Sequence, residues 1–170
     1  LTSSPTIQKM NVVINNRQRM KKIHSRLLRQ IVNELFAELE IETAELGINL
    51  VGAREMTLVN ETFLRHEGST DVITFDHAEK RKTKNEKRKK LHGELFICVD
   101  DAIQQAEEFG TSWQSEVVRY VVHGVLHLLG YDYLKPNLRL TMKHAENRLV
   151  RRLKQRFSLA QLARTGKIRA

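Results

Sequence analysis

Residues 120–133, "YVVHGVLHLLGYDY", decide the fold, because nearly every side chain other than the two histidines is apolar or aromatic. The surrounding pattern predicts a helix over residues 113–129, with Ser112 as its N-cap and Gly130 as the left-handed residue that ends it. A helix that is apolar on almost all sides is buried. The sequence therefore predicts a buried helix that is polar only where its histidines emerge.

The rest of the chain alternates between strand-like and helix-like patterns. Strands are expected at residues 11–15, 46–52, 70–75 and 93–99, and further helices at 18–40, 54–66, 100–110 and 138–156. Asp100 and Asp101 are expected to cap the helix that follows them. This order predicts an α/β fold, in which a small mixed β-sheet is packed with helices.

The net charge of +9 is concentrated in two segments. Residues 79–90 and 148–170 each hold eight basic side chains, whereas the remainder has 13 basic and 18 acidic groups. We expect one domain over residues 1–156, with a basic loop at 76–92, and a basic tail at 157–170. The loop side chains predicted to contact RNA phosphates are Lys80, Arg81, Lys82, Lys84, Lys87, Arg88, Lys89 and Lys90.

The single cysteine, Cys98, cannot form a disulfide within the chain and lies in an apolar run, which is typical of a small buried side chain. The longest apolar stretches carry histidines and fall short of the roughly 20 residues that a membrane-spanning helix needs. The first residues do not resemble a secretory signal. We therefore expect a cytoplasmic protein.

His123 and His127 are four residues apart, so on a helix both can direct a ring nitrogen at one metal ion. The alternative is a pair of core histidines hydrogen-bonded to nearby oxygens. The turn at Gly130 favours a metal site, because it can return residues 131–133 to the same ion as a third ligand, leaving a fourth position for water. Gly124 stands where zinc peptidases have a glutamate base, so peptide hydrolysis is disfavoured. We expect this small residue to let a bulky substrate approach the metal.

The sequence around these histidines resembles that of the YbeY-type rRNA maturation factors, a family of metal-dependent, single-strand-specific endoribonucleases. Its signature H-G-x-L-H-L-x-G-Y-D-H is similar to "HGVLHLLGYDY" at every fixed position but the last. Two further family motifs resemble "NETFLRHEGSTDVITF" at 60–75 and "HGELFI" at 92–97, with Glu94 in the acidic place. The resemblance spans roughly residues 46–150.

The resemblance implies that His123 and His127 bind one Zn²⁺ per chain and that Arg65 is a catalytic residue contacting phosphate. It also implies that the metal-binding histidine helix lies at the centre of the α/β fold. The implied role is in 16S rRNA maturation and ribosome quality control, with rRNA of the small ribosomal subunit as partner and a ribosomal protein as a further candidate. Without the resemblance, Arg65 is simply a surface arginine that closes a helix. Glu94 either orients an imidazole or forms a salt bridge, and Asp132 is a second supporting acid.

The third ligand position of the family is occupied by Tyr133 instead of histidine. Three hypotheses remain open: Tyr133 binds zinc weakly because a phenol has a pKa near 10, another donor replaces it, or no stable metal binds. The candidate replacement donors are Asp132, His144, His92, His77 and His66. The function is accordingly either a metal-dependent endoribonuclease or an RNA-binding factor of the same fold with little hydrolysis. A metal hydrolase for a small substrate would leave the basic segments unexplained.

Overall fold

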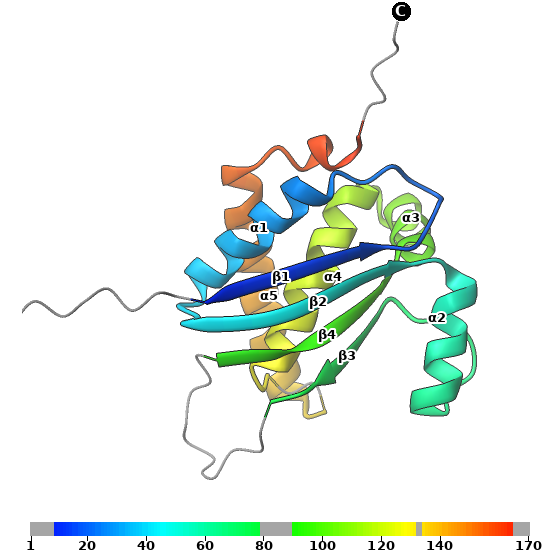
Figure 1. Ribbon diagram of the computed structural model, residues 1–170, viewed down its shortest axis with the longest axis horizontal. Coiled ribbons are helices and arrows are strands. Elements are labelled where there is room, and N and C mark those ends of the chain that lie inside the picture. The colour runs from blue at the N-terminus through cyan, green and yellow to red at the C-terminus, as the bar shows by residue number, and fades with distance from the viewer. Residues whose placement is uncertain (1–8, 79–89, 132–133, 165–170) are drawn as a thin grey trace, which may run out of the picture.

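A computed structural model describes residues 9–78, 90–131 and 134–164 (Figure 1). The strands are β1 (Met10–Asn16), β2 (Thr43–Val51), β3 (Val72–Asp76) and β4 (Lys90–Cys98). The α-helices are α1 (Ser25–Glu38), α2 (Ala53–Val59), α3 (Val99–Phe109), α4 (Trp113–Leu128) and α5 (Pro136–Arg156). A π-helical turn, η1 (Asn60–Leu64), continues α2, and a 3₁₀ turn, η2 (Leu159–Leu162), follows α5.

The four strands form one mixed sheet in the order β1-β2-β4-β3. β1, β2 and β4 are parallel, and β3 runs antiparallel to β4 at the edge. Helix α1 connects β1 to β2, since a parallel pair of strands needs a crossover connection. The predicted α/β class with a small mixed sheet is confirmed.

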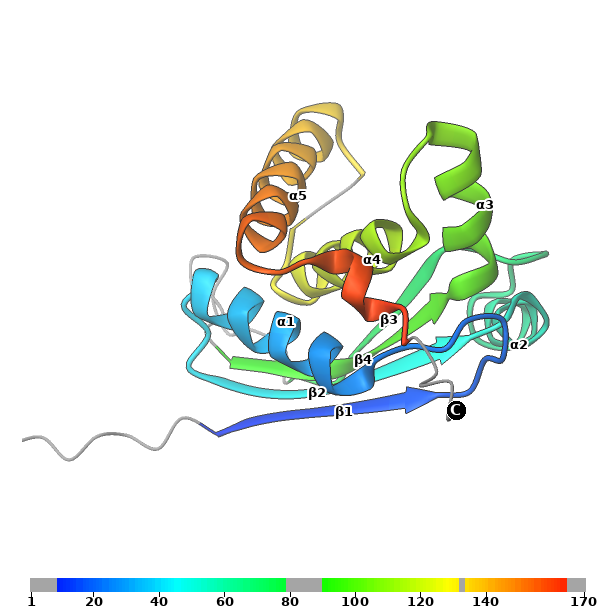
Figure 2. The same ribbon diagram turned by 90° about the horizontal axis from the view of Figure 1, so that it is seen from above.

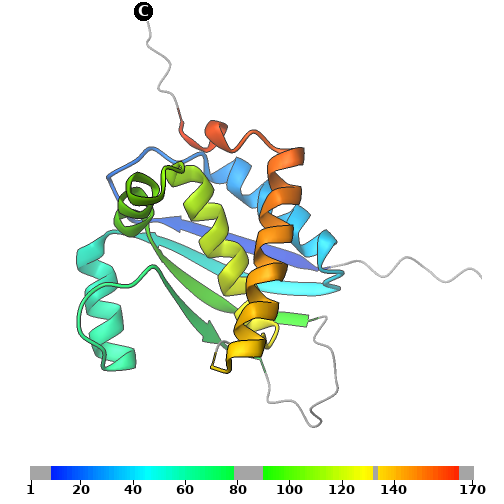
Figure 3. The same ribbon diagram turned by 180° about the vertical axis from the view of Figure 1, so that it is seen from behind.

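One face of the sheet carries α1, α4 and α5, as Figures 2 and 3 show. The apolar side chains of this face, among them Ile48, Leu95 and Ile97, join the buried side chains of the helices in the main core. Helix α4 is buried along its length, including Val122 and Val125 at 0% exposure. This burial confirms the prediction of a central histidine helix.

Among the described residues, α2 covers the opposite face near the ends of the strands. There Met56 and Val59 pack against Val51, Ile73 and Cys98 in a second, smaller core cluster. We call the rest of this side the open face. Because side chains alternate along a strand, it carries the side chains of Val13, Asn15, Glu45, Asn49, Phe75, His77, His92, Glu94 and Phe96.

Two glycines allow α4 to approach the sheet closely. A Cβ on Gly124 would lie 2.7 Å from Cδ2 of Leu95, and a Cβ on Gly93 would lie 2.9 Å from both terminal carbons of Leu128 in α4. Gly124 is buried against β4 instead of bordering an approach to the metal. The expectation that it admits a bulky substrate is therefore wrong, and its physical role is to bring the helix and the sheet into contact.

The first predicted helix, 18–40, is shorter than expected, because α1 begins only at Ser25. The buried side chain of Gln18 holds the preceding segment in a turn, accepting hydrogen bonds from the backbone N–H groups of Met20 and Lys21 at 2.8 and 3.0 Å. His24 then caps α1, its Nδ1 accepting a hydrogen bond from the Leu27 N–H at 3.1 Å. These side-chain contacts compete successfully with an earlier helix start.

Two details around β4 also differ from the sequence expectation. The strand begins at Lys90 instead of residue 93, so Lys90 is an exposed strand residue. The N-cap of α3 is Cys98, and Asp100 instead accepts a hydrogen bond from the first N–H of α2, at Ala53, at 2.5 Å. Asp100 thus caps a different helix from the one predicted. The other loop residues predicted to contact phosphate, Lys80 to Lys89, lie outside the described residues.

Helix α5 ends at Arg156, and the chain then turns back along the body. Leu162 is fully buried, and the His24 N–H donates to its carbonyl oxygen at 2.8 Å. The division between a domain at 1–156 and a tail at 157–170 stays a prediction. Among the described residues, no helix is both long and apolar enough to cross a membrane.

Candidate metal centre

The two histidines occupy the last turns of α4, which ends as the sequence predicts. Gly130 has a φ of 97°, its N–H donates to the His127 carbonyl at 2.9 Å, and the Tyr131 N–H donates to the Leu126 carbonyl at 3.0 Å. These two bonds form a Schellman motif that turns the chain sharply after the second histidine. The rings of His123 and His127 are half-buried, with centroids 4.7 Å apart. Both imidazoles therefore share one site.

A buried carboxylate on α5 holds the first histidine. Oε2 of Glu146 lies 2.9 Å from Nδ1 of His123, and its other oxygen accepts a hydrogen bond from Arg119 at 2.7 Å. Arg119 also donates to the side chain of Asn147 at 2.8 Å. Neither Glu146 nor Arg119 was predicted from the sequence. One sequence signal pointed to Glu146: it is an acidic residue next to Ala145, on the apolar side of the last predicted helix.

The charge state of Glu146 follows from these contacts. Burial raises the pKa of this carboxyl. Hydrogen bonds and positive charge from His123 and Arg119 lower it by more than burial raises it, so the pKa is below its ordinary value. Glu146 is therefore an ionised acceptor at neutral pH, although it is only 5% exposed. An ionised acceptor at Nδ1 favours the ring form of His123 that carries its proton there.

This pair fits a metal site. A histidine that binds a metal through one nitrogen commonly donates its other N–H to a carboxylate, which fixes the ring and its tautomer. With Glu146 at Nδ1, the nitrogen of His123 directed away from α5 is Nε2. His127, one turn further along α4, presents the second imidazole.

The third ligand is not found in the part of the chain that the structure describes. Within residues 9–78, 90–131 and 134–164, no group of three or more His, Cys, Asp or Glu side chains could hold a metal. Asp132 and Tyr133 lie outside these ranges, so their predicted roles are untested. His144 is exposed and two residues from Glu146, which places it on the far side of α5.

Two of the other replacement donors lie on the open face, opposite α4. The rings of His77 and His92 are 5.6 Å apart, and Nε2 of His92 lies 3.6 Å from a carboxylate oxygen of Glu45. Nε2 of His77 lies 3.7 Å from Oε2 of Glu94, whose other oxygen accepts from Asn49 at 2.8 Å. Glu94 thus adjoins the imidazole of His77, and its part in the site stays a prediction.

The predicted phosphate-contacting residue, Arg65, follows η1 directly and is exposed. Its backbone is left-handed, with φ 54° and ψ 30°. Residues other than glycine, asparagine and aspartate seldom adopt this conformation, and such strain concentrates at functional sites. The remaining candidate donor, His66, follows Arg65 and is also exposed, with its N–H bonded to the Asn60 carbonyl.

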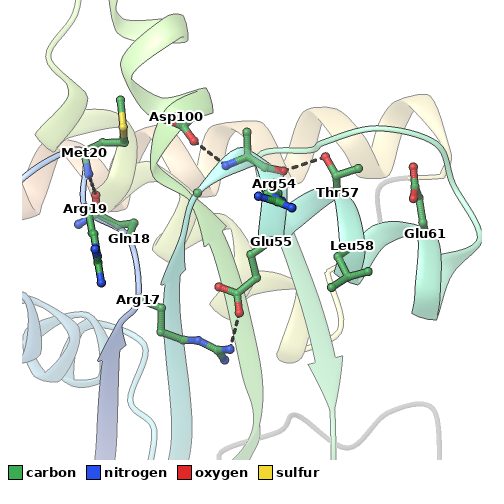
Figure 4. Close-up of a pocket in the computed structure, with 12 residues that line it drawn as sticks. Arg17, Gln18, Arg19, Met20, Arg54, Glu55, Thr57, Leu58, Glu61 and Asp100 are labelled. Carbon is green, nitrogen blue, oxygen red and sulfur yellow. Dashed lines mark hydrogen bonds and ion pairs between the residues drawn. The ribbon is translucent and has the colours of Figure 1, made fainter.

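Two cavities are lined by described residues. One, of about 430 Å³, lies beside His123 and is lined by side chains of α4 and α5, including Arg119, Arg139 and Lys143. The other, of about 690 Å³, lies between the segment after β1 and the start of α2, and contains none of the predicted site residues (Figure 4). Its Arg17 is paired with Glu55, as the same view shows. Of these two cavities, the one beside His123 therefore adjoins the candidate metal centre.

Comparison with known proteins decides the family. Residues 9–154 match the family model described as Endoribonuclease YbeY. The chain belongs to the YbeY endoribonuclease family. The match covers every described element from β1 to most of α5 and both histidines.

Curated YbeY relatives agree with this assignment. The chain is similar to the endoribonuclease YbeY of Myxococcus xanthus, with 32% identity over 88% of this chain and 50% of the relative. It is 33% identical to that of a Sulfurihydrogenibium species over 74% of this chain and 80% of the relative. The YbeY of Bacteroides fragilis is 30% identical, over 81% and 93% of the two chains.

A solved structure supports the fold. The solution structure of TM1509 from Thermotoga maritima matches with a TM-score of 0.61 and covers 94% of this chain and 99% of its own. Sequence identity is 22%, so this likeness concerns the fold alone.

Proposed function

We propose that this YbeY-family chain is a zinc-dependent endoribonuclease that cleaves single-stranded RNA. Its proposed biological substrate is rRNA of the small ribosomal subunit, in 16S rRNA maturation and ribosome quality control. The observation that carries the proposal is the buried Glu146–His123 pair beside His127 on α4. A core histidine that is merely hydrogen-bonded to a carboxylate does not require a second imidazole one turn away. A metal site does require a second ligand at that position.

In this mechanism the chain's own residues orient the metal-binding histidine and neutralise the charge of the RNA phosphate. Glu146 holds His123 in one tautomer, and Arg119 holds Glu146 in turn. A zinc ion held by His123 and His127 would act as a Lewis acid and would lower the pKa of a water molecule. Arg65 contacts the phosphate, because a guanidinium can donate to two phosphoryl oxygens and offset the negative charge that develops there.

Tyr133 is proposed as the third, weak ligand, and the basic segments as phosphate contacts. Lysine and arginine side chains neutralise the backbone without reading bases, so affinity should fall steeply with salt and depend little on sequence. Deleting residues 80–89 should weaken RNA binding at low salt. Unchanged affinity would remove that segment from the proposal.

Metal content and cleavage test the function together. We expect zinc to bind the purified chain, and cleavage of single-stranded RNA to require it. His127→Ala, which removes one imidazole, should abolish both, and cleavage that persists in this variant would reveal a contaminating nuclease. RNA binding without cleavage in the zinc-loaded wild type would contradict the proposal and identify an RNA-binding factor.

Substitution at position 133 then identifies the third ligand. Tyr133→His should raise zinc affinity, because a neutral imidazole binds zinc at pH 7 more readily than a phenol does. Tyr133→Phe should lower the affinity if the phenol oxygen is a ligand. Undiminished zinc in Tyr133→Phe would exclude direct binding by this tyrosine.

A further inference from the structure

A row of three phenylalanines crosses the open face of the sheet near its β3 edge. The rings of Phe63 and Phe75 meet edge to face with centroids 5.6 Å apart, and those of Phe75 and Phe96 do so at 5.7 Å. The three residues come from η1, β3 and β4. Because each ring rests on its neighbour, the row is a supported surface instead of a set of separate side chains.

Phe63 ends this row and is 65% exposed, although it is large and apolar. It belongs to the π-helical turn η1, and the left-handed Arg65 lies two residues further along the chain. π-helical turns and left-handed non-glycine residues are both uncommon, and both occur preferentially at functional sites. The turn that presents Phe63 is therefore the same turn that places the proposed phosphate-contacting arginine.

The sequence between β3 and β4 is rich in positive charge, which suits binding to the phosphates of a nucleic acid strand. The segment that joins β3 to β4 carries seven lysines and arginines between positions 80 and 89, and Lys90, at the start of β4, is exposed. Two acids are also present on this face. Glu94 bonds to Asn49 and adjoins His77, and Glu45 adjoins His92, so each carboxylate already has a polar partner.

We propose that Phe63, supported by Phe75 and Phe96, is a stacking platform for unpaired bases of single-stranded RNA. This inference rests on the proposed function, because it takes the single-stranded RNA of that function as its ligand. Stacking on an exposed aromatic ring accepts any base, since every base has a π-face. It excludes duplex RNA, whose base faces are covered by neighbouring base pairs. The platform therefore accounts for selection of single strands without sequence preference.

Fluorescence tests stacking directly and without cleavage or metal. In Phe63→Trp, a short single-stranded RNA should quench the new tryptophan, whereas an abasic strand of equal length and the corresponding duplex should quench it much less. The wild type provides the baseline for the natural Trp113. Phe109→Trp is the matched control, because Phe109 is 67% exposed and lies at the end of α3, away from the row. Equal quenching by RNA and by the abasic strand would overturn the proposal.

Affinity provides the second readout. Phe63→Leu should weaken single-strand binding by about 5- to 150-fold, the loss of one stacked base, while Phe109→Leu should leave it unchanged. Circular dichroism would verify that both variants fold. If the wild type cleaves RNA but Phe63→Leu binds it equally well, the platform is wrong while the proposed function stands, and the surface then fits a protein contact. If RNA quenches the tryptophan of Phe63→Trp but the zinc-loaded wild type does not cleave, the platform stands and the proposed function fails.

Discussion

Replacing Gly93 by alanine should disturb the packing of β4 against both β3 and α4. The added Cβ would lie 2.7 Å from the carbonyl oxygen of Phe75 and 2.9 Å from both terminal carbons of Leu128. A backbone oxygen cannot swing aside as a side chain can, so we expect an overpacking cost near the upper end of the usual range, about 3 kcal/mol. Loss of glycine flexibility in the unfolded chain offsets about 0.4–1 kcal/mol. The net loss in the free energy of unfolding is about 2 kcal/mol.

Urea denaturation followed by circular dichroism would measure this loss, with a corresponding fall in Tm of about 4–8 °C. Gly47→Ala is the matched control, because Gly47 also lies in a strand of this sheet but its Cβ would be 3.4 Å from a flexible carbon of Glu94. The control should be neutral or slightly stabilising. Equal stability of Gly93→Ala and Gly47→Ala would refute the close-packing explanation. Since Leu128 follows His127, Gly93→Ala should also lower zinc affinity.

Other predictions concern charge and hydrogen bonding. Asp101→Asn should stabilise the protein at pH 7, because burial and nearby Asp71 raise the pKa of Asp101 in the folded chain. The wild type gains stability as the pH falls through that raised pKa, so the stability advantage of Asp101→Asn should vanish below about pH 4. If urea titrations at that pH still showed the variant to be more stable, the raised pKa would not be the cause. Glu146→Gln should weaken zinc binding by about 10- to 100-fold in a chelator competition, and an unchanged affinity would show that the carboxylate does not orient His123. Gln18→Ala should lower the free energy of unfolding by about 2 kcal/mol, because it removes the four hydrogen bonds of this buried side chain. A loss below about 0.5 kcal/mol in urea denaturation would contradict that role.

Features that depend on neighbouring residues could be predicted from the sequence. Ser112 caps α4 by accepting from the Ser115 N–H at 3.1 Å, and Gly130 ends it, because both groups act within a few residues. The apolar pattern around His123 predicted a buried helix for a similarly local reason. The family motif, which is continuous over α4 and the turn after it, located the two histidines.

The tertiary structure alone decided which distant groups meet. Glu146 reaches His123 across 23 positions, and Asp100 caps a helix that begins 47 positions before it. The need for glycine at positions 93 and 124 arises only because α4 packs closely on β4. The phenylalanine row likewise forms only because η1, β3 and β4 lie side by side. Periodicity specifies which face of an element is buried. It does not specify the partner of that face, which depends on strand order and register. The support of the histidine helix depends on those long-range contacts.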